Sequence, residues 1–294
     1  MKVFVAGGTG FIGTVVCRRL LDGGHEVTAA ARDPDDADLP EAVSRTELDV
    51  TDEEDVPAAV AGHDAVVHLV SLSPLYQPPH EGAYEEVIVN GTHNLVDAAR
   101  AADVERFVYL SGLGVDPDGP TAFLRAKGRA EELVRGRRND WVILRPSIVF
   151  GDGAEILSFT RRTTTPYVTA LPGGGRTRFQ PIWVGDLAGI ILETVDDPGR
   201  AGETYELGGP EVLSLADIAR AIHAADGRSL RIVPVPMSIA SLGLTLAGPV
   251  PFVPFGPDQA RSLRLDNVPA ENDVAQFGMD PAELTTFGEY LEGW

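Results

Sequence analysis

Three glycines near the N-terminus have the spacing of a phosphate-binding turn. They follow the short apolar segment 2–6 and precede an amphipathic segment, 11–21. A strand that runs through a glycine turn into a helix directs free backbone N–H groups and the positive end of the helix dipole at a pyrophosphate. Gly7 allows the tight turn, Gly10 lets the phosphates approach, and Gly13 lets the helix pack closely. We predict that this turn binds a dinucleotide through Gly7, Thr9, Gly10, Phe11, Ile12 and Gly13; the alternative is a strand–helix corner without a ligand.

An arginine and an aspartate stand where such a fold meets the adenosine ribose. Arg32 and Asp33 follow the predicted second strand, 26–31. An aspartate would accept from the free 2′-hydroxyl of NAD, whereas an arginine would pair with the 2′-phosphate of NADP. Because Arg32 comes first and Asp33-Pro34 already turns away, the sequence favours NADP(H) over NAD(H). The alternative is that Arg32 lies across the adenine or the surface.

Two further strand ends should reach the nucleotide. The third strand is expected to end at 48–50, with Thr51 capping the next helix, and the fourth to span 65–70. Asp49 could accept from the adenine amino group or be a turn residue, and Val50 would lie nearby. Leu69, Val70 and Ser71 would lie near the ribose. The proline-rich loop 73–79 could cover the site.

The elements that position these residues alternate between strand and helix as far as residue 145. A long helix is predicted over 81–102, a strand over 106–111, a helix over 121–135 and a strand over 141–144. Gly91 inside the long helix costs about 1 kcal/mol relative to alanine, so we expect a close approach of another segment there. This alternation predicts an α/β fold, a Rossmann doubly wound parallel sheet.

The alternation stops after Gly151. A helix is predicted over 185–195, a strand over 204–207, a helix over 215–225 opened by a Ser214–Asp217 capping box, a strand over 231–235, a short apolar helix over 236–247, and a last helix opened by Asp280. We expect a dinucleotide-binding domain of residues 1–151 with the returning segment 179–207. Residues 152–178 and 208–294 would form a smaller C-terminal α/β substrate or lid domain.

Charge excludes one class of partner. The chain has 44 acidic and 24 basic residues and a formal net charge of −20, so nucleic acid is not an expected partner. Lys2 and Lys127 are its only lysines. Acid-rich, lysine-poor usage is typical of salt-loving organisms, where salt screens the self-repulsion of an acidic surface.

Other features bear on location. A single cysteine, Cys17, excludes an intrachain disulfide, fits a reducing cytoplasm and is expected to be a buried small hydrophobe. The first strand begins at residue 2, so no signal peptide is expected. The uncharged run 232–257 holds too many prolines for one membrane-spanning helix. It could instead cover a greasy substrate or make a protein-complex or peripheral membrane contact, at the inner face of the membrane.

Longer motifs give a family resemblance over essentially the whole chain. They are AGGTGFIG, LDVTD, VVHLVS, NGTHNLVDAAR, FVYLSG, LRPSIVFG, FQPIWVGDLA, YELGGPEVLS and PFGPDQARSLRLDN. The chain resembles the atypical and extended short-chain dehydrogenase/reductases, or epimerase/dehydratase-like proteins. It is most similar to the subgroup of the Rossmann-fold, NADPH-carrying accessory subunit of respiratory complex I. The resemblance implies a Rossmann domain with a small C-terminal substrate domain.

The resemblance also implies which residues would act at the nicotinamide. Active members use a Tyr-x-x-x-Lys pair, helped by a serine at the end of the fifth strand. Here the lysine matches Lys127 and the serine Ser111, and Pro146 and Ile148 would frame the nicotinamide, but the tyrosine position holds Phe123. A phenyl ring has no ionisable proton, so acid–base catalysis worth typically ~10² to 10⁴-fold is missing in its usual form. A compact ammonium reaching two ribose hydroxyls would explain why Lys127 is not arginine; the alternative is a surface lysine.

Other groups could supply the missing proton. Tyr109, Tyr76 and Tyr84 are candidates, although packing or lid roles are the simpler expectation, and His68 reads as a hydrogen-bonded core residue. No spacing suggests a metal site, and no nucleophile elbow supports a hydrolase triad. Two hypotheses remain: an NADP(H)-dependent oxidoreductase acting on a small carbonyl, sugar-like or isoprenoid/quinone-type substrate, and a non-catalytic NAD(P)H-holding subunit or redox sensor of a larger complex.

Overall fold

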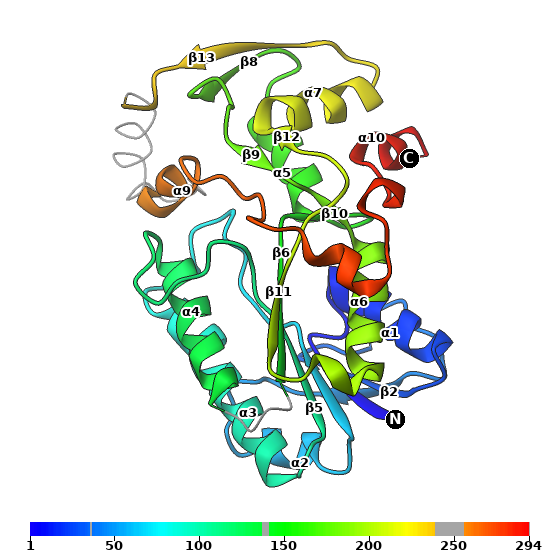
Figure 1. Ribbon diagram of the computed structural model, residues 1–294. Helices are drawn as coiled ribbons and strands as arrows, with labels where there is room; N and C mark the ends of the chain where they lie inside the picture. The colour runs from blue at the N-terminus through cyan, green and yellow to red at the C-terminus, as the bar shows by residue number, and fades with distance from the viewer. Residues whose placement is uncertain (36, 137–140, 239–255, 294) are drawn as a thin grey trace.

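A seven-stranded sheet forms the centre of the molecule (Figure 1). The computed structural model describes residues 1–35, 37–136, 141–238 and 256–293. The strand order is β11-β6-β5-β4-β1-β2-β3, and every neighbouring pair is parallel. The strands are β1 (Lys2–Ala6), β2 (Glu26–Ala31), β3 (Ser44–Glu47), β4 (Ala65–His68), β5 (Arg106–Leu110), β6 (Trp141–Pro146) and β11 (Glu203–Leu207). The predicted Rossmann sheet is confirmed, and its order reverses between β1 and β4, where such folds bind ligands.

Helices cover both faces of this sheet. On one side lie α1 (Phe11–Asp22) and α6 (Val184–Asp196), and on the other α2 (Val56–Val60), α3 (Gly91–Ala101) and α4 (Ala122–Arg135). Because successive side chains of a strand point to opposite faces, Val3 and Val5 pack in the first core and Phe4 and Ala6 in the second. All four side chains are fully buried. This is why β1 reads as a continuous apolar run.

The remaining elements gather above the carboxyl ends of the strands. We call the following set the cap: α5 (Glu155–Thr163), β8 (Tyr167–Pro172), α7 (Leu215–Ala225), β13 (Leu230–Val235), α9 (Pro257–Ser262) and α10 (Phe287–Glu292). β8 pairs in parallel with β13, and α5, α7 and α10 share a separate apolar core. The Ser214–Asp217 capping box of α7 is present as predicted. Short pairs join the cap to the sheet: β7 (Val149–Phe150) with β10 (Ile182–Trp183), and β9 (Arg178–Phe179) with β12 (Leu213–Ser214).

Several predicted element ends were wrong. The third and fourth strands stop at Glu47 and His68, earlier than expected. Thr51 does not cap a helix: its N–H and hydroxyl donate to Asp49 Oδ1 at 2.9 and 2.8 Å, and α2 begins only at Val56. The side chain of Asp49 therefore stabilises a local turn in place of a helix start.

The long helix predicted over 81–102 consists of two helix types. A π-helix covers Glu85–Asn90 and continues directly into α3 at Gly91. A Cβ added to Gly91 would lie 2.8 Å from Val50 Cγ2, so the predicted close approach is confirmed. The last helix is opened by a Thr286–Glu289 capping box, whereas Asp280 caps only a 3₁₀ turn (Pro281–Glu283). Most of the apolar helix predicted over 236–247 lies outside the described residues.

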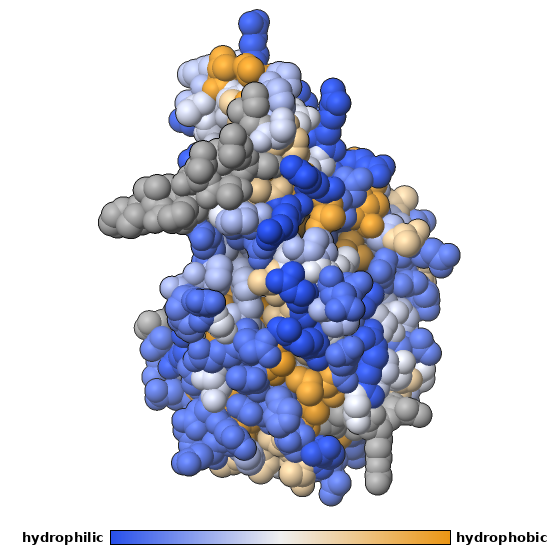
Figure 2. Space-filling model, turned by 90° about the vertical axis from the view of Figure 1, so that its left-hand side faces the viewer, coloured by the Kyte–Doolittle hydropathy of each residue, from blue (hydrophilic) through white to orange (hydrophobic). Residues whose placement is uncertain are grey.

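The surface combines a polar body with scattered apolar patches. Figure 2 shows hydrophilic residues over most of one side, with an apolar patch at the top, on the cap. Exposed apolar side chains of the cap include Val168 on β8 and Val233 on β13. Within the residues that the structure describes, no helix combines the length and apolarity needed to cross a bilayer.

Candidate functional site

The glycine turn leaves β1 at the reversal of strand order. Gly7 has φ +82°, and its N–H donates to Ala30 O at 2.9 Å. A Cβ on Gly13 would lie 2.1 Å from Gly7 O, so only glycine fits where α1 meets the turn. A Cβ on Gly10 would meet only Gly7 O, at 3.4 Å. Gly8, which the motif did not single out, is also constrained, though less than Gly13, because its Cβ would lie 2.7 Å from Ala29 Cβ and 2.8 Å from Ala29 Cα.

The first turn of α1 has no side-chain cap. Its N-cap is Gly10, and the first intrahelical bond is Thr14 N–H to Gly10 O at 2.9 Å. The amides of Phe11, Ile12 and Gly13 therefore have no partner within the helix. No acidic side chain lies in this first turn. Unsatisfied N–H groups and the positive dipole end suit a pyrophosphate, so the residues present fit the predicted dinucleotide.

A large cavity opens onto this turn. Its volume is about 1220 Å³, and it runs between the strand ends and the cap. The predicted site residues that line it are Gly7, Gly10, Phe11, Ile12, Gly13, Leu69, Ser71, Ser111, Lys127, Pro146 and Ile148. Thr9, Arg32, Asp49, Val50 and Val70 do not line it. The structure thus brings the predicted nicotinamide residues and all the predicted pyrophosphate residues except Thr9 into one space, together with Leu69 and Ser71, and leaves Arg32, Asp49 and Val50 outside it.

The adenosine residues lie along the ends of β2 and β3. Arg32 follows β2 and is exposed. Its guanidinium makes no hydrogen bond or ion pair with the described residues, although its charge reaches Asp49. The Thr51 amide, with a smaller contribution from Arg32, holds the pKa of the exposed Asp49 below its usual range. Val50 and Val70 pack into the core on the α3 side.

Lys127 lines the cavity and is not a surface lysine. Its side chain is 2% exposed. Nζ donates to Leu110 O at 2.8 Å, at the end of β5, and lies 4.7 Å from the centre of the Tyr109 ring. Burial lowers the pKa of Lys127 from 10.5 to about 7, against the opposing charge of Glu131. The ammonium is therefore held at the strand end by main-chain contact, in a position to meet a ligand in the cavity.

Phe123 lies one helical turn before Lys127 and also lines the cavity. Its ring meets the Tyr84 ring edge-on at 5.8 Å. Among the described residues no tyrosine lines the cavity, so the three that we considered as proton donors do not reach it. Tyr109 is fully buried in the α3 and α4 core, and the Tyr84 hydroxyl donates to Ser73 O. His68 is a core residue as expected, with Nε2 2.9 Å from Thr92 Oγ1.

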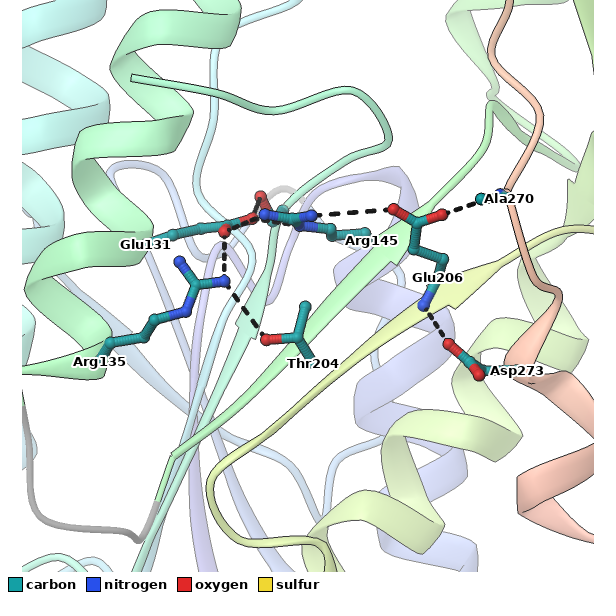
Figure 3. Close-up of polar contacts among 8 residues, drawn as sticks. Glu131, Arg135, Arg145, Thr204, Glu206, Ala270 and Asp273 are labelled. Atoms are coloured by element: carbon teal, nitrogen blue, oxygen red, sulfur yellow. Dashed lines mark hydrogen bonds and ion pairs between the residues drawn. The ribbon is translucent and has the colours of Figure 1, made fainter. Parts of the chain in front are cut away.

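Ser111 is engaged by a carboxylate that the motifs did not identify. Its hydroxyl donates to Glu131 Oε1 at 2.6 Å. Glu131 is 1% exposed and also accepts from Arg145 Nε at 2.8 Å and from an Arg135 NH₂ group at 2.8 Å (Figure 3). In this arrangement the Ser111 proton points to Glu131. The signal in the sequence was the position of Glu131, four residues after Lys127 and four before Arg135 on one face of α4.

This network reaches across the sheet toward the chain's C-terminal segment. Arg145 NH1 lies 3.8 Å from Glu206 Oε1 on β11, and Glu206 Oε2 accepts from Ala270 N at 3.0 Å. The Glu206 amide donates to Asp273 Oδ2 at 2.8 Å (Figure 3). Side chains on α4, β6 and β11 and the segment 270–273 are therefore joined by one series of polar contacts.

Comparison with known proteins identifies the family. A family model described as NAD(P)H-binding matches residues 7–198. The chain belongs to this family. Within it, the chain is an extended short-chain dehydrogenase/reductase of the subgroup of the complex I alpha subcomplex subunit 9. That mitochondrial subunit from Arabidopsis thaliana is 30% identical over 281 residues, covering 90% of this chain and 68% of the relative.

Other proteins to which the chain is similar carry enzyme names. An NAD(P)H azoreductase from Xenophilus azovorans is 28% identical over 248 residues, covering 84% of this chain and 81% of the relative. Solved structures share the fold. A nucleoside-diphosphate-sugar epimerase from Staphylococcus aureus has a TM-score of 0.75 at 20% identity, covering 99% of this chain and 100% of the other. A Thermus thermophilus UDP-glucose 4-epimerase in complex with NAD has a TM-score of 0.69 at 21% identity, covering 99% and 96%.

Proposed function

We propose that this chain binds NADP(H), with the pyrophosphate on the first turn of α1 and the nicotinamide beside Lys127, and that it is not a conventional carbonyl reductase. One observation carries the proposal: the cavity joins the uncapped helix end to Lys127, yet no described tyrosine lines it. The chain's own groups would bind and orient the nucleotide. Bound NADPH would supply a hydride, and be oxidised to NADP⁺, only with an acceptor that obtains its proton elsewhere.

Arg32 supports NADP(H) over NAD(H). It follows β2 directly and makes no ion pair with the described residues, so it can pair with a 2′-phosphate without breaking an existing contact. Titration with NADPH and NADH tests this assignment. Arg32→Ala should weaken NADPH selectively, whereas Asp33→Ala should leave NADPH affinity unchanged. An equal loss for both nucleotides in Arg32→Ala would reject the 2′-phosphate contact.

The missing tyrosine hydroxyl at position 123 can be tested by restoring it. The wild-type protein should bind NADPH tightly and oxidise it slowly or not at all with simple ketones, and Lys127→Ala should only weaken binding. Phe123→Tyr restores the missing hydroxyl on the cavity wall and should raise turnover. Rapid ketone reduction by the wild-type protein would contradict the proposal, and failure of both nucleotides to bind would remove its basis.

A second candidate function is an oxidoreductase in which Lys127 supplies the proton. Hydride transfer to a simple carbonyl leaves an alkoxide, which is at least as strong a base as hydroxide and needs a proton donor at once. Transfer to a quinone leaves a phenolate-type anion. Because the corresponding phenol has a pKa of ~10, a weaker acid can protonate this anion than can protonate an alkoxide. A buried ammonium on the cavity wall can meet that demand. Quinone reduction whose rate falls above about pH 7 in step with Lys127 deprotonation would favour this candidate.

The first proposal, nucleotide binding without conventional catalysis, also allows a role as a non-catalytic subunit of a larger assembly. The relatives named as complex I subunits belong by name to a larger assembly, and a chain without a relay could serve such an assembly by holding the nucleotide. Co-purification of the native protein with other chains, together with NADPH binding without turnover, would support this role. A stable monomer with turnover would exclude it.

A further inference from the structure

The cavity continues beyond Lys127 into the cap. Its volume of about 1220 Å³ exceeds the ~300–1,000 Å³ typical of a site for one small ligand, so a second molecule has room beside a nicotinamide. The far walls come from α5, β8, α7, β13 and the segment after α9. Their apolar side chains are Ile156, Phe159, Leu171, Ala219, Val235 and Leu263. We call this part the far chamber.

Three of the described hydroxyl groups in the far chamber donate to main-chain oxygens of the protein. Thr163 Oγ1 donates to Phe159 O at 2.9 Å, and Thr164 Oγ1 to Thr160 O at 2.6 Å. Ser262 Oγ donates to Asp258 O at 3.0 Å. Of the described hydroxyls on this wall, Thr160 Oγ1 lacks a partner. The three donating hydroxyls can still accept but have no proton left to donate, so a sugar ring with several hydroxyls would find few donors here, and burying unpaired hydroxyls is unfavourable.

The amide of Gln259 is also satisfied. Its Nε2 donates to Tyr76 O at 2.9 Å and to Pro74 O at 3.2 Å, and its Oε1 accepts from Gly256 N at 2.9 Å. These bonds tie α9 to the loop 73–79 over the cavity. Gln259 therefore closes the wall and does not present a free amide to a ligand.

Charge in the cavity is equally sparse. Its described ionisable residues are Lys127, Glu155, Arg264 and Asp266, of which only Lys127 is buried. Asp266 is paired with Arg178 at 2.7 Å. A nucleotide sugar carries a diphosphate, which proteins usually hold with arginine forks or helix ends. Of the two helix N-termini on the cavity that have no side-chain cap, that of α1 is assigned to the cofactor, and that of α5 carries Glu155 in its first turn, which disfavours a diphosphate.

We propose that the far chamber binds a molecule with a long apolar alkyl or prenyl chain, whose polar head group faces Lys127, and that it does not bind a nucleotide sugar. The chamber offers an apolar lining for the chain and one buried cation for the head. Burial of an alkyl chain against apolar side chains is favourable, and the gain increases with the number of CH₂ groups buried. The assignment of the head group rests on the proposed function, because it faces the nicotinamide position, whereas chain binding can be measured by itself.

The test compares a decyl-substituted benzoquinone with UDP-glucose by calorimetry, on the full chain with and without NADPH. We expect the quinone to bind with a negative heat-capacity change, the mark of apolar burial, and UDP-glucose to give no binding. Ala170→Trp narrows the chamber wall on β8 and should weaken quinone binding at least tenfold. Ala224→Trp, on the exposed side of α7 and outside the cavity, is the matched control and should change nothing.

Two further results complete the design. Phe159→Ala removes a half-buried part of the wall and should also weaken the quinone, which keeps the test valid if Ala170→Trp does not fold. NADPH affinity should persist in every variant. Binding of UDP-glucose without the quinone, or equal affinity in Ala170→Trp and Ala224→Trp, would overturn the proposal. Quinone binding without any NADPH binding would instead refute the proposed function and leave the chamber assignment standing.

Discussion

At the scale of single residues, Lys127 is held in an unfavourable place. Its ammonium is nearly excluded from water, and burial disfavours the charged form more than Glu131 favours it. A structural role alone could be filled by an apolar side chain of similar length. A charge retained at such a cost indicates a function at the cavity wall.

Replacing Lys127 by methionine should flatten the pH dependence of stability. Between about pH 7 and 10.5 the unfolded lysine holds its proton and the folded one releases it. The free energy of unfolding of the wild-type protein should therefore rise with pH in this window, by up to ~1.4 kcal/mol per pH unit from this group. Below pH 7 the full cost of the buried charge remains. Urea unfolding across pH measures the difference, with Lys2→Met as the exposed control. Parallel pH profiles for wild type and Lys127→Met would contradict the shift.

Glu131→Gln should destabilise the protein strongly. The carboxylate accepts from Ser111, Arg135 and Arg145, and its neutral replacement would leave Arg145 with only the more distant carboxylate of Glu206, at 3.8 Å, as an ion-pair partner. Breaking a buried ion pair typically costs ~3–5 kcal/mol. Glu132→Gln, one residue on and exposed, is the matched control and should change stability by less than ~0.5 kcal/mol. Similar unfolding midpoints for the two variants would show that the network is dispensable.

The sequence predicted the residues that belong to local motifs. These motifs, whose members are close along the chain, contain Gly7, Gly10, Gly13 and Lys127. Their common cavity was also predictable, because the carboxyl ends of parallel strands meet at one edge of the sheet. The engagement of Ser111 by Glu131 could not be read in this way, because it spans 20 residues and depends on how α4 lies against β5 and β6. The same limit made three tyrosines reasonable candidates, since a strand face does not reveal which side the cavity is on.

At the scale of elements, α4 sets the position of Lys127, and a glycine fixes α4. A Cβ on Gly128 would lie 2.3 Å from Pro117 N and 2.5 Å from Asp116 C, so the helix contacts the backbone of the preceding loop. At the N-terminus of α4, Ala122 N donates to Asp258 Oδ2 of α9 at 2.7 Å. Periodicity predicted the helix, but neither of these contacts leaves a periodic signal.

Gly128→Ala should therefore lower stability, against the usual trend for a helix. Alanine in a helix interior is normally better than glycine by about 0.5–1 kcal/mol. At Gly189 in α6 a Cβ would meet nothing within 4 Å, so Gly189→Ala should show that gain. At Gly128 the alanine Cβ would clash with backbone atoms, so this variant should lose about 1–3 kcal/mol of the free energy of unfolding in spite of the better helix propensity. Urea denaturation of the two variants gives the comparison; a gain in both would mean that the loop moves aside freely.

At the scale of the whole molecule, the regular alternation of strands and helices was enough to predict the sheet. The order β3-β2-β1-β4-β5-β6 follows once crossovers are right-handed and helices cover both faces. The placement of the cap could not be predicted, because it depends on contacts such as Gln259 with the loop 73–79 and Ser147 Oγ with Asn267 O at 2.7 Å. These join segments more than 100 residues apart, where sequence pattern carries no information on geometry.

The net charge of −20 leads to a prediction for the whole molecule. Adding sodium chloride weakens two opposing effects, the repulsion among excess carboxylates and the attraction within surface ion pairs. Exposed pairs such as Arg18–Asp38, with side chains 45% and 99% exposed, contribute ~0–1 kcal/mol each. The repulsion acts among many more charges and extends over the Debye length, which falls from ~10 Å at 0.1 M to ~3 Å at 1 M salt. The loss of repulsion should therefore dominate, and the urea midpoint should rise with sodium chloride. Urea is the right denaturant because guanidinium is itself a salt. A midpoint that falls with salt would mean that the ion pairs outweigh the repulsion.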